Sequence, residues 1–398
     1  MALPEVLSPV AGSGRVWLDR LRIRDFRNLE PADFALPPDG LALVGDNGEG
    51  KTNFLEAIYY LQLLRSFRGA RDPELVRFGA SGFHLAAGIG GARASEVAVG
   101  FDRGGPARGE GTSGRGRKRV RVDGAEPTRL SDALGSLPAV IFSPQDAVLV
   151  TGAPSERRRF LDVILAVTSR PYLAALQRYR AALANRNAAL REAASAGTRA
   201  SEGAVAAWEP ALAETGAVLW LARQAWVGAH AVQFAALCSA IGERGESRLA
   251  YVTRLDHALG PRDVTGALLE ALERKRALDI RRGLTHAGPH RDDLAIRLDG
   301  RELRSYGSAG QQRTAAIALR LLEAATLRAS AGSEPLVLLD DPFAELDARR
   351  AGQILELLRA EERGQTLLVV PRASDIPADL TRLERWRVEG GALSPGTR

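Results

Sequence analysis

The feature that most constrains the fold is an octapeptide of the form G-x-x-x-x-G-K-T, made of Gly45, Asp46, Asn47, Gly48, Glu49, Gly50, Lys51 and Thr52. The apolar run before it, Leu41–Val44, is typical of a buried strand, and residues 53–61 have apolar side chains at helical spacing. A strand, a glycine-rich turn and a helix form the context in which this motif binds phosphate, because backbone N–H groups and the helix N-terminus face the phosphate oxygens. The sequence therefore predicts that residues 45–53, which end in Asn53, bind a nucleoside triphosphate.

The last two side chains of the motif have separate expected roles. Lys51 is placed to reach the β- and γ-phosphates, and Thr52 offers a hydroxyl ligand to Mg²⁺. We therefore expect ATP and Mg²⁺ as cofactors. The alternative is a chance match, since the chain contains 41 glycines, but chance would not supply the flanking strand and helix.

A second strand candidate supplies the carboxylates that such a site requires. Leu336–Leu339 is the most hydrophobic strand candidate of the chain, and it ends in Asp340 and Asp341. This is the form of a Walker B element, in which Asp340 holds Mg²⁺ through water and Asp341 orients or deprotonates the attacking water. We predict Lys51, Asp340 and Asp341 as the catalytic residues, with the phosphate loop and residues 336–339 in one sheet.

Two further segments resemble elements of the ABC-type ATPases. Residues 342–347 resemble the D-loop and end in Asp347, and the start of a later helix resembles the signature motif S-G-G-Q, with the residues Ser308, Ala309, Gly310 and Gln311. A hydroxyl and free N–H groups at a helix start suit a phosphate, whereas Ser308 alone would be interpreted as a helix N-cap. In ABC-type ATPases the signature of one subunit closes over nucleotide held by the other. Because this chain has one copy of each element, we expect an ATP-dependent head-to-tail homodimer.

Two ABC-type elements remain: the Q-loop has a candidate residue in this sequence, and the switch histidine is missing. Gln145, which follows the strand candidate Ala139–Phe142, is the best candidate for the Q-loop, where it would sense Mg²⁺ together with Thr52 and Asp340 and link two lobes. The switch histidine expected after residues 366–370 is missing, because Pro371 and Arg372 stand there. This departure indicates slow hydrolysis.

Composition and charge narrow the classes of partner. The formal net charge is +6 and the isoelectric point is near 9.9, which favours polyanionic partners. Cys238 is the only cysteine, so neither a disulfide within the chain nor a cysteine-based metal site is possible. No apolar run approaches the roughly 20 residues that span a bilayer, and the N-terminus lacks a secretion signal, so we expect a cytoplasmic protein without a membrane contact.

The order of the segments predicts an α/β fold with an insertion. We expect a flexible tail at residues 1–15, the N-terminal part of an ATPase lobe at 16–150, a mainly helical second lobe at 151–290, and the C-terminal part of the ATPase at 291–398. The helical part does not sustain the heptads of an extended coiled coil. The predicted fold class is a P-loop ATPase head of the ABC type with an inserted helical lobe.

Several motifs together resemble the bacterial RecF family of SMC-like ATPases. The segments that match that family's pattern are Arg24–Leu29, Lys51–Leu61, Arg65–Arg68, Phe142–Pro144, Pro154–Asp162, Gly288–Leu294 and Asp340–Asp347. The resemblance therefore covers nearly the whole chain. It implies an SMC-like head without a long coiled coil and a weak, DNA-stimulated ATPase. It also implies double-stranded DNA and ssDNA–dsDNA junctions as partners, and joint action with RecR and RecO in loading RecA at gaps.

The residues agree with a DNA partner in outline. A flexible cationic stretch supplies the candidate contacts to phosphates, which are Arg115, Arg117, Lys118, Arg119 and Arg121. A solvated face or internal salt bridges would explain any single cluster equally well. No base-reading motif is present, so we expect contacts to the backbone rather than to bases.

Two other classes of protein fit the sequence less well. A transporter ATPase carries its signature much closer to the phosphate loop than Ser308 lies to Lys51, and an SMC-type tether needs long heptad repeats. The run His290–Asp293 resembles a kinase loop without the accompanying kinase motifs, and its carboxylates are too close in sequence to define a metal geometry. A structural or nucleotide-coupling role suits it better.

Overall fold

The computed structural model describes residues 15–91, 94–104, 116–196, 199–255, 259–343, 348–360, 364–380 and 382–396. The chain divides into two compact units. Unit 1 comprises residues 1–146 and 319–398, and unit 2 comprises residues 147–318. The expected tail at 1–15 falls, apart from its last residue, outside the described part, as do the D-loop residue Asp347 and the DNA-contact candidate Arg115.

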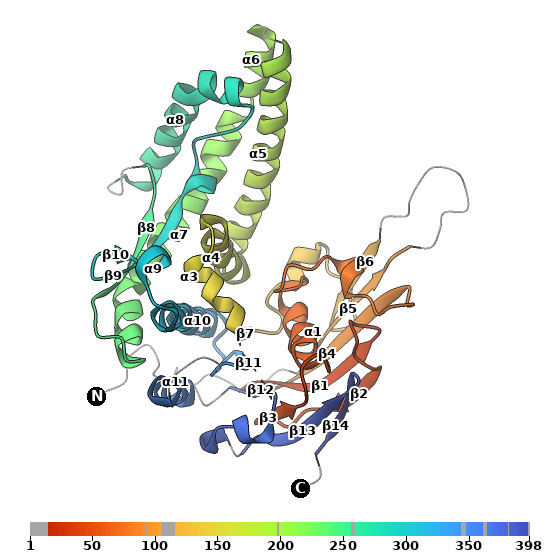
Figure 1. Ribbon diagram of the computed structural model, residues 1–398. Coiled ribbons are helices and arrows are strands. Elements are labelled where there is room, and N and C mark those ends of the chain that lie inside the picture. Colours follow the sequence, from red (N-terminus) through yellow and green to blue (C-terminus); the bar gives the residue numbers. More distant parts are fainter. Residues whose placement is uncertain are drawn as a thin grey trace. The chain divides into compact units, whose positions relative to one another are not determined.

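The core of unit 1 is a six-stranded sheet with the order β14-β13-β3-β12-β11-β7 (Figure 1). All neighbouring strands in it are parallel except β13 and β14. The strands are β3 (Gly40–Val44), β7 (Ala139–Phe142), β11 (Leu336–Asp340), β12 (Thr366–Val370), β13 (Glu384–Glu389) and β14 (Ala392–Pro395). The four strands from β3 to β7 are almost entirely buried, as parallel strands covered on both faces are. The predicted union of the phosphate-loop strand and the late strand in one sheet is confirmed, with β12 between β3 and β11.

A second, antiparallel sheet of unit 1 has the order β2-β1-β4-β5-β6. Its strands are β1 (Val16–Arg24), β2 (Ala32–Ala35), β4 (Gly82–Gly91), β5 (Ser95–Asp102) and β6 (Arg117–Val122). One face is apolar and buried, for example at Leu21, Leu85 and Val99, while the alternate residues are charged or small.

Helix α1 (Lys51–Leu63) contacts strands of both sheets, and nearly all of its residues are buried. It therefore forms the middle layer of unit 1, and this fixes the direction in which its N-terminus points. Unit 1 also contains the short helix α2 (Asp72–Leu75) and the helix α11 (Ala348–Ala360).

Unit 2 is mainly helical, as expected, but it also contains a small sheet with the order β10-β9-β8. The helices are α3 (Val148–Thr151), α4 (Pro154–Thr168), α5 (Arg170–Ala196), α6 (Arg199–Ala206), α7 (Glu209–Ala240), α8 (Pro261–Arg282) and α9 (Leu303–Tyr306). The strands are β8 (Ser247–Val252), β9 (Asp293–Leu298) and β10 (Arg301–Glu302). Figure 1 shows the long helices α5, α7 and α8 running alongside one another. The described helices of up to 32 residues form no extended coiled coil.

The boundaries of the units differ from the sequence expectation at one end. Residues 291–398 were expected to form the C-terminal part of the ATPase, but β9 pairs with β8, a strand that the sequence analysis did not predict. Unit 2 therefore continues past residue 290 to Ala318, inside helix α10 (Ala309–Ala331). The signature residues belong to unit 2 by this division. No described helix is long and apolar enough to cross a membrane.

Candidate nucleotide-binding site

The phosphate loop lies between β3 and α1, and its backbone requires glycine at two positions. Gly48 and Gly50 have φ angles of +90° and +118°, which L-residues rarely adopt. A side chain at Gly50 would also place its Cβ 3.0 Å from Asn28 Oδ1 and from a methyl carbon of Leu29. The Asn28 amide donates a hydrogen bond to the carbonyl of Gly48 at 3.1 Å. The loop is therefore supported from outside by the segment that follows β1.

Lys51 is the first residue of α1 and is nearly buried, with 9% of its surface exposed. Its ammonium group donates to the carbonyls of Gly45 at 2.6 Å and Asp46 at 2.8 Å, so the side chain folds back over the loop. Burial lowers the pKa of Lys51, while the carboxylates of Asp340 and Asp341 oppose that shift. The ammonium group thus lies among backbone carbonyls and carboxylates, where a phosphate would add compensating negative charge.

Thr52 and Asp340 meet although they are far apart in the sequence. The Thr52 hydroxyl donates to both carboxylate oxygens of Asp340, at 3.0 and 3.1 Å. Burial raises the pKa of Asp340, and the neighbouring charge of Asp341 adds to the rise. A hydroxyl and a carboxylate side by side at the cavity supply the hard oxygen ligands that Mg²⁺ prefers, so these residues fit that ion.

Asp341 has a backbone conformation that is unusual for a non-glycine residue, with φ of +43°. Its N–H donates to the carbonyl of Val369 at 3.0 Å, which continues the pairing of β11 with β12 by one residue. Strained conformations of this kind cost of the order of 1–3 kcal/mol and are concentrated at functional sites. The strain turns the chain sharply at the end of β11, where the predicted catalytic carboxylate stands.

A cavity of about 510 Å³ brings these residues together with the Q-loop candidate. Its lining includes Lys51, Thr52, Gln145, Asp340 and Asp341, all within unit 1. Pro371 also lines this cavity, so the position after β12, where a switch histidine was expected, faces the site with a side chain that has no hydrogen-bonding group. Gln145 is exposed, and its backbone N–H donates a hydrogen bond to the Ser143 hydroxyl at 3.2 Å.

The residue after Gln145 holds its loop in place. Asp146 is nearly buried; one carboxylate oxygen accepts from the Ser143 N–H at 2.8 Å and the other from the Arg320 guanidinium at 2.6 Å. Arg320 also pairs with the buried Glu323 at 2.6 Å. These carboxylates hold the pKa of Arg320 well above its usual value despite burial. The loop that carries Gln145 is therefore tied to α10 by a charged cluster.

Two arginines that sequence reasoning did not assign to the site also line the cavity. Arg27 and Arg68 are both oriented by Glu56, which is fully buried on α1. Arg27 forms a two-pronged ion pair with Glu56, at 2.9 and 3.1 Å, and Arg68 lies 3.7 Å from the same carboxylate. The Ser66 hydroxyl donates to it as well. The signal in the sequence was a glutamate inside the apolar run of α1, where an unpaired charge would be costly.

Asn53 and Glu49 are used within unit 1 in different ways. The Asn53 amide donates to Asn28 Oδ1 at 2.8 Å and accepts from Arg68 at 3.0 Å. Glu49 accepts a hydrogen bond from the N–H of Gly390, at the turn between β13 and β14. Both side chains thus brace the phosphate loop, and their predicted contact with nucleotide stays a prediction.

The signature segment opens helix α10, as predicted. The Gln311 N–H donates to the Ser308 hydroxyl at 3.3 Å, and the Ser308 N–H donates to the Gln311 side chain at 2.9 Å. This reciprocal pair is a capping box. The N-cap interpretation of Ser308 is therefore correct, and it does not compete with phosphate binding, because the backbone N–H groups of Ala309 and Gly310 still begin the helix. The role in a second subunit's site stays a prediction.

The candidate DNA contacts on β6 fall into two groups, the exposed arginines and the packed Lys118. Arg117, Arg119 and Arg121 alternate along the exposed face of β6. Lys118 points the other way: it forms an ion pair with Asp72 at 2.8 Å, donates to the carbonyl of Leu64 and lies over the Tyr60 ring at 5.0 Å. This packing leaves Lys118 a poor candidate for a phosphate contact, since it would have to leave three partners.

The run His290–Asp293 lies in unit 2 and is used structurally. His290 lies between the Tyr179 hydroxyl, at 2.6 Å, and the carbonyl of Thr285, at 3.1 Å. Asp292 accepts from the Tyr251 hydroxyl at 2.6 Å, and Asp293 pairs with Arg157 at 2.8 Å. Across the described residues, no group of three His, Cys, Asp or Glu side chains is arranged to hold a metal ion.

Comparison with known proteins identifies the family. Residues 17–379 match the family described as the RecF/RecN/SMC N terminal domain. The DNA replication and repair protein RecF of Salinibacter ruber is 38% identical over 358 residues, which cover 89% of this chain and 85% of the relative. The RecF of Roseiflexus castenholzii is 38% identical over 403 residues, which cover 96% of this chain and all of the relative.

Solved structures agree with this result. A structure of the recombination mediator protein RecF with ATP has a TM-score of 0.86 at 28% identity and covers 96% of this chain and 98% of its own. The Smc head domain of Pyrococcus furiosus, at 16% identity and a TM-score of 0.53 with 95% of both chains covered, shares the fold alone. The fold and the phosphate loop thus define an ABC-type ATPase head of the RecF/RecN/SMC group. Within that group, the chain belongs to the RecF family.

Proposed function

We propose that this chain is an ATP-binding and ATP-hydrolysing protein of recombinational DNA repair that uses ATP to close a homodimer on DNA. The observation that carries the proposal is the meeting of Lys51 and Thr52 with Asp340 at one cavity, in a chain of the RecF family. The names of the relatives, DNA replication and repair protein RecF, support the repair assignment. The ATP named with the solved RecF structure supports the ligand.

The chemistry follows from the side chains at the cavity. Lys51 would bind the β- and γ-phosphate oxygens, and Thr52, Asp340 and Gln145 would hold Mg²⁺, which neutralises developing charge on the phosphates. Asp341 would take the proton of the attacking water while the water oxygen bonds to the γ-phosphorus. The bond from that phosphorus to the β,γ-bridging oxygen breaks, and ADP and phosphate leave. Pro371 offers no donor to the γ-phosphate, which supports slow turnover.

The test compares Lys51→Ala, Asp341→Asn and Lys275→Ala. A fluorescent ATP analogue measures binding, and phosphate release measures hydrolysis with and without duplex DNA. Lys51→Ala should lose binding, Asp341→Asn should bind and fail to hydrolyse, and Lys275→Ala, a lysine of unit 2, should match the wild type in both. Retention of ATP binding by Lys51→Ala would refute the assignment of the loop. DNA should stimulate the wild-type rate.

The homodimer is proposed from the signature in α10. Because Ser308 caps the helix, Ser308→Ala should cost about 1 kcal/mol of stability, whereas Ser308→Asp keeps a good cap. The aspartate would, however, place a negative charge where the γ-phosphate of the partner's nucleotide is expected. Sedimentation velocity with ATP should therefore show a dimer for the wild type and a monomer for Ser308→Asp, with ATP binding retained. A dimer of Ser308→Asp with ATP would contradict a composite site.

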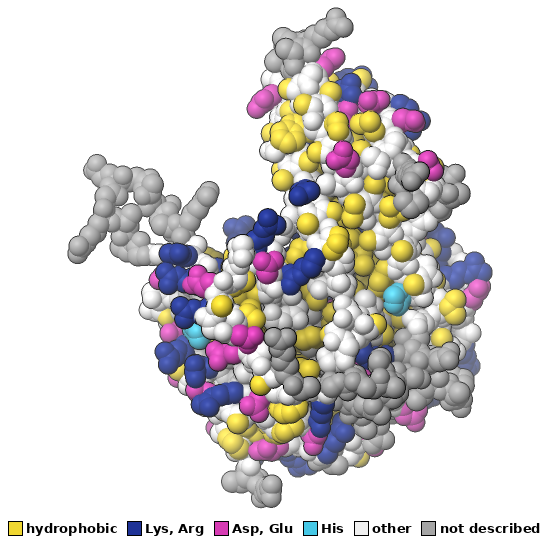
Figure 2. Space-filling model, turned by 180° about the vertical axis from the view of Figure 1, so that it is seen from behind, with side chains coloured by type: hydrophobic (Ala, Val, Ile, Leu, Met, Phe, Trp, Pro, Cys, Tyr) yellow, Lys and Arg dark blue, Asp and Glu magenta, His cyan; other side chains and the backbone are white. Residues whose placement is uncertain are grey.

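DNA binding is proposed for the outer face of the five-stranded sheet. The register places Arg24, His84, Gly100 and Arg119 in one row across β1, β4, β5 and β6. The next row runs Arg22, Ala86, Ala98 and Arg121. At about 4.8 Å per strand, the arginines at the two ends of a row stand about 14 Å apart, and the residues between them are small except for His84. Figure 2 shows Lys and Arg side chains on the side of the molecule that carries this sheet.

The charges on this face are mixed, and their balance favours an anion. Asp33 pairs with Arg20 and Arg22, whereas Arg24, Arg119 and Arg121 form no ion pair with another described residue. The pKa of His84, at the centre of the face, is lowered first by burial and then by the positive charges of Arg24, Arg22 and Arg121. A positive face with a shallow centre suits a sugar–phosphate backbone rather than base edges.

The DNA test removes two arginines and keeps a matched control. Arg119→Ala/Arg121→Ala should weaken binding to duplexes of any sequence and reduce the slope of log affinity against log salt by about 2, since each phosphate contact contributes about 0.9. Arg248→Ala/Arg301→Ala removes the same charge from exposed positions of unit 2 and should keep the wild-type slope. Equal slopes for all three proteins would exclude this face.

The pathway partners are proposed from the comparisons. The solved RecF structures are described as belonging to the RecFOR pathway. We therefore propose that the chain, closed by ATP on double-stranded DNA or at an ssDNA–dsDNA junction, acts with RecR and RecO to load RecA. A labelled gapped duplex should retain RecR only when this chain and ATP are both present. Retention of RecR without ATP would contradict the order of events.

A further inference from the structure

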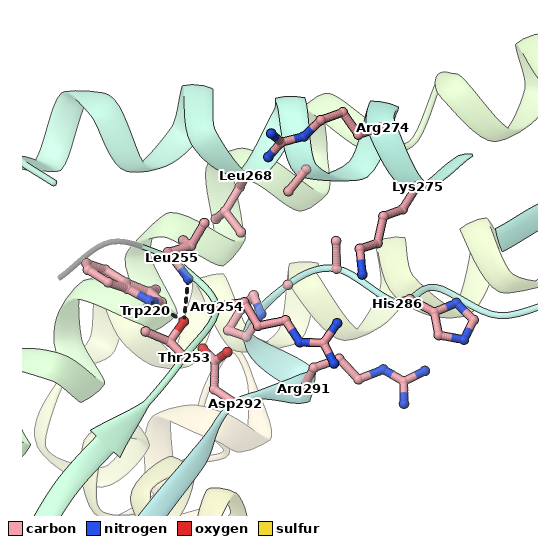
Figure 3. A pocket seen from close by; sticks show the side chains of 14 residues that line it. Trp220, Thr253, Arg254, Leu255, Leu268, Arg274, Lys275, His286, Arg291 and Asp292 are labelled. Atoms are coloured by element: carbon pink, nitrogen blue, oxygen red, sulfur yellow. Dashed lines mark hydrogen bonds between the residues drawn. The ribbon is translucent and has the colours of Figure 1, made fainter. Parts of the chain in front are cut away.

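Unit 2 contains a cavity of about 360 Å³ that the nucleotide chemistry does not use (Figure 3). Its floor is apolar and comes from three elements: Trp220 of α7, Leu268 and Ala271 of α8, and the segment after α8 that includes Ala287 and Pro289. In Figure 3, Leu268 and Lys275 extend from α8 toward the segments below it. The volume lies in the range that small ligands or a bulky side chain occupy.

The lining also carries an excess of positive charge. Arg254, Arg274, Lys275 and Arg291 come from three different segments, and none forms an ion pair with a carboxylate of the described residues. Arg291 donates to the carbonyl of Thr285, which fixes the base of its guanidinium without neutralising it. The one carboxylate in the lining, Asp292, is committed to the Tyr251 hydroxyl at 2.6 Å. Four cations thus line an apolar floor, and within the described part of the chain no carboxylate forms an ion pair with them.

The polar groups inside the cavity already have partners. The Trp220 indole donates to the Thr253 hydroxyl at 2.9 Å, and His286 pairs with Asp279 at 2.7 Å. Leu268, Ala271 and Pro289 offer no side-chain donor or acceptor that could read the edge of a base. The floor of the cavity therefore suits an apolar side chain, while the remaining side-chain donors of the lining belong to Arg254, Arg274, Lys275 and Arg291.

The distribution of the cations also favours a peptide as the occupant of the cavity. Arg274 and Lys275 lie in the second half of α8, away from the helix N-terminus that would favour a single phosphate, and Arg254 and Arg291 lie on other segments. Charges on several sides of a cavity match several carboxylates along a chain. An acidic peptide with a central aromatic or aliphatic residue has that arrangement.

We propose that this cavity binds an acidic segment of a partner protein, which inserts one apolar side chain between α7 and α8 and sets its carboxylates against Arg254, Arg274, Lys275 and Arg291. The site lies wholly within unit 2, and its lining shares no residue with the nucleotide cavity. The proposal therefore does not depend on the ATPase assignment.

The probe is the fluorescein-labelled peptide Gly-Glu-Asp-Phe-Glu-Asp-Gly, titrated with the full chain at low salt and followed by fluorescence polarisation. Replacing its Phe by Ala should weaken binding about tenfold, which corresponds to the loss of one buried anchor. A peptide with Lys and Arg in place of the acids should not bind. Equal binding of the Phe and Ala peptides would overturn the proposal, because the cavity would then contribute nothing.

Variants of the protein locate the site. Arg274→Glu/Lys275→Glu should weaken binding of the Phe peptide at least about tenfold, whereas Arg281→Glu/Arg282→Glu, the same change near the end of α8 and outside the cavity, should change it less than about twofold. Ala271→Trp should fill the cavity and abolish binding while ATP binding and thermal stability are kept. Wild-type peptide affinity in Ala271→Trp would overturn the proposal.

Competing occupants are distinguished in the same assay. Unlabelled duplex DNA or ATP that displaces the peptide from the wild type would reassign the cavity to a nucleic acid or nucleotide and overturn the proposal. So would a loss of self-association in Ala271→Trp without any peptide binding by the wild type, because a second copy would then be the occupant. Displacement by unlabelled acidic peptide alone supports it.

Discussion

Glu56 offers the sharpest test of how the candidate nucleotide site is held. Its carboxylate is fully buried and receives two hydrogen bonds from Arg27, at 2.9 and 3.1 Å, and one from Ser66. Arg68 lies 3.7 Å away. Glu56→Gln keeps the shape of the side chain but removes the charge and places an amide donor among groups that are themselves donors.

The loss of stability in Glu56→Gln depends on how far water reaches the arginines that pair with Glu56. Neutralising one partner of a fully buried ion pair costs about 3–5 kcal/mol, because the other charge is left without compensation. Here the side chains of Arg27 and Arg68 keep 21% and 36% of their exposure, so water screens part of the loss. We therefore expect a destabilisation of about 2–3 kcal/mol.

Urea unfolding followed by tryptophan fluorescence measures this loss, since Trp17 and Trp386 report on unit 1. With a urea dependence of about 3 kcal/mol/M, the midpoint should fall by about 0.7–1 M. The exposed Glu126 supplies the control, because Glu126→Gln should stay within about 0.5 kcal/mol of the wild type. A midpoint of Glu56→Gln equal to that of this control would refute the reasoning.

A functional consequence accompanies the change in stability. Arg27 and Arg68 line the candidate nucleotide cavity, and Glu56 fixes the direction of both guanidinium groups. Glu56→Gln should therefore weaken ATP binding even at temperatures where the protein stays folded. Unchanged ATP affinity would show that the two arginines do not act on the nucleotide.

Three further predictions test other parts of the chain. Arg186→Met removes a fully buried arginine that pairs with Glu209 at 2.9 Å and Asp279 at 2.8 Å, and it should destabilise unit 2 by about 3–5 kcal/mol in urea unfolding, without loss of ATP binding. Burial lowers the pKa of His290 to about 4, so the unfolded chain binds more protons than the folded chain between about pH 6.5 and pH 4. The free energy of unfolding should therefore decrease as the pH is lowered from about 6.5 to about 4, and it should decrease less steeply in His290→Gln. Thr52→Ala removes one expected Mg²⁺ ligand, and it should raise the Mg²⁺ concentration for half-maximal hydrolysis about tenfold, a loss of about 1.4 kcal/mol, which a magnesium titration of phosphate release would detect.

Much of unit 1 could be predicted from the sequence because its signals are local. A few neighbouring residues are enough to predict each of three features: the turn at the glycines of the phosphate loop, the buried strands β3 and β11, and the carboxylates after β11. Two fully apolar runs in an α/β chain have few places other than a parallel sheet. That is why β3 and β11 could be placed in one sheet although 291 residues lie between Val44 and Leu336.

Contacts that depend on partners far away in the chain could not be predicted in the same way. β8 alternates buried and exposed residues over only six positions, and its pairing with β9 decides that β9 belongs to unit 2. The cationic stretch was expected to be flexible, but residues 117–122 form the strand β6. The ion pair of Lys118 with Asp72 and its contact with Tyr60 could not be predicted either, since those residues come from α2 and α1. A sequence pattern indicates which face of a strand is buried. It does not indicate which charged residue from another element lies next to a given side chain.

The phosphate loop itself shows why a local motif needs distant support. Asp25 and Arg27 have φ angles of +53° and +56°, so the chain turns sharply after β1 and brings Asn28 against Gly48 and Gly50. From Asn28 the hydrogen bonds continue through Asn53 to Arg68, and Arg68 lies beside the same buried Glu56 that holds Arg27. The segment after β1 and the segment after α1 therefore clamp the loop from both sides. The glycines allow the backbone of the loop to curve, and the hydrogen bonds of Asn28, Asn53 and Arg68 stabilise that curved conformation.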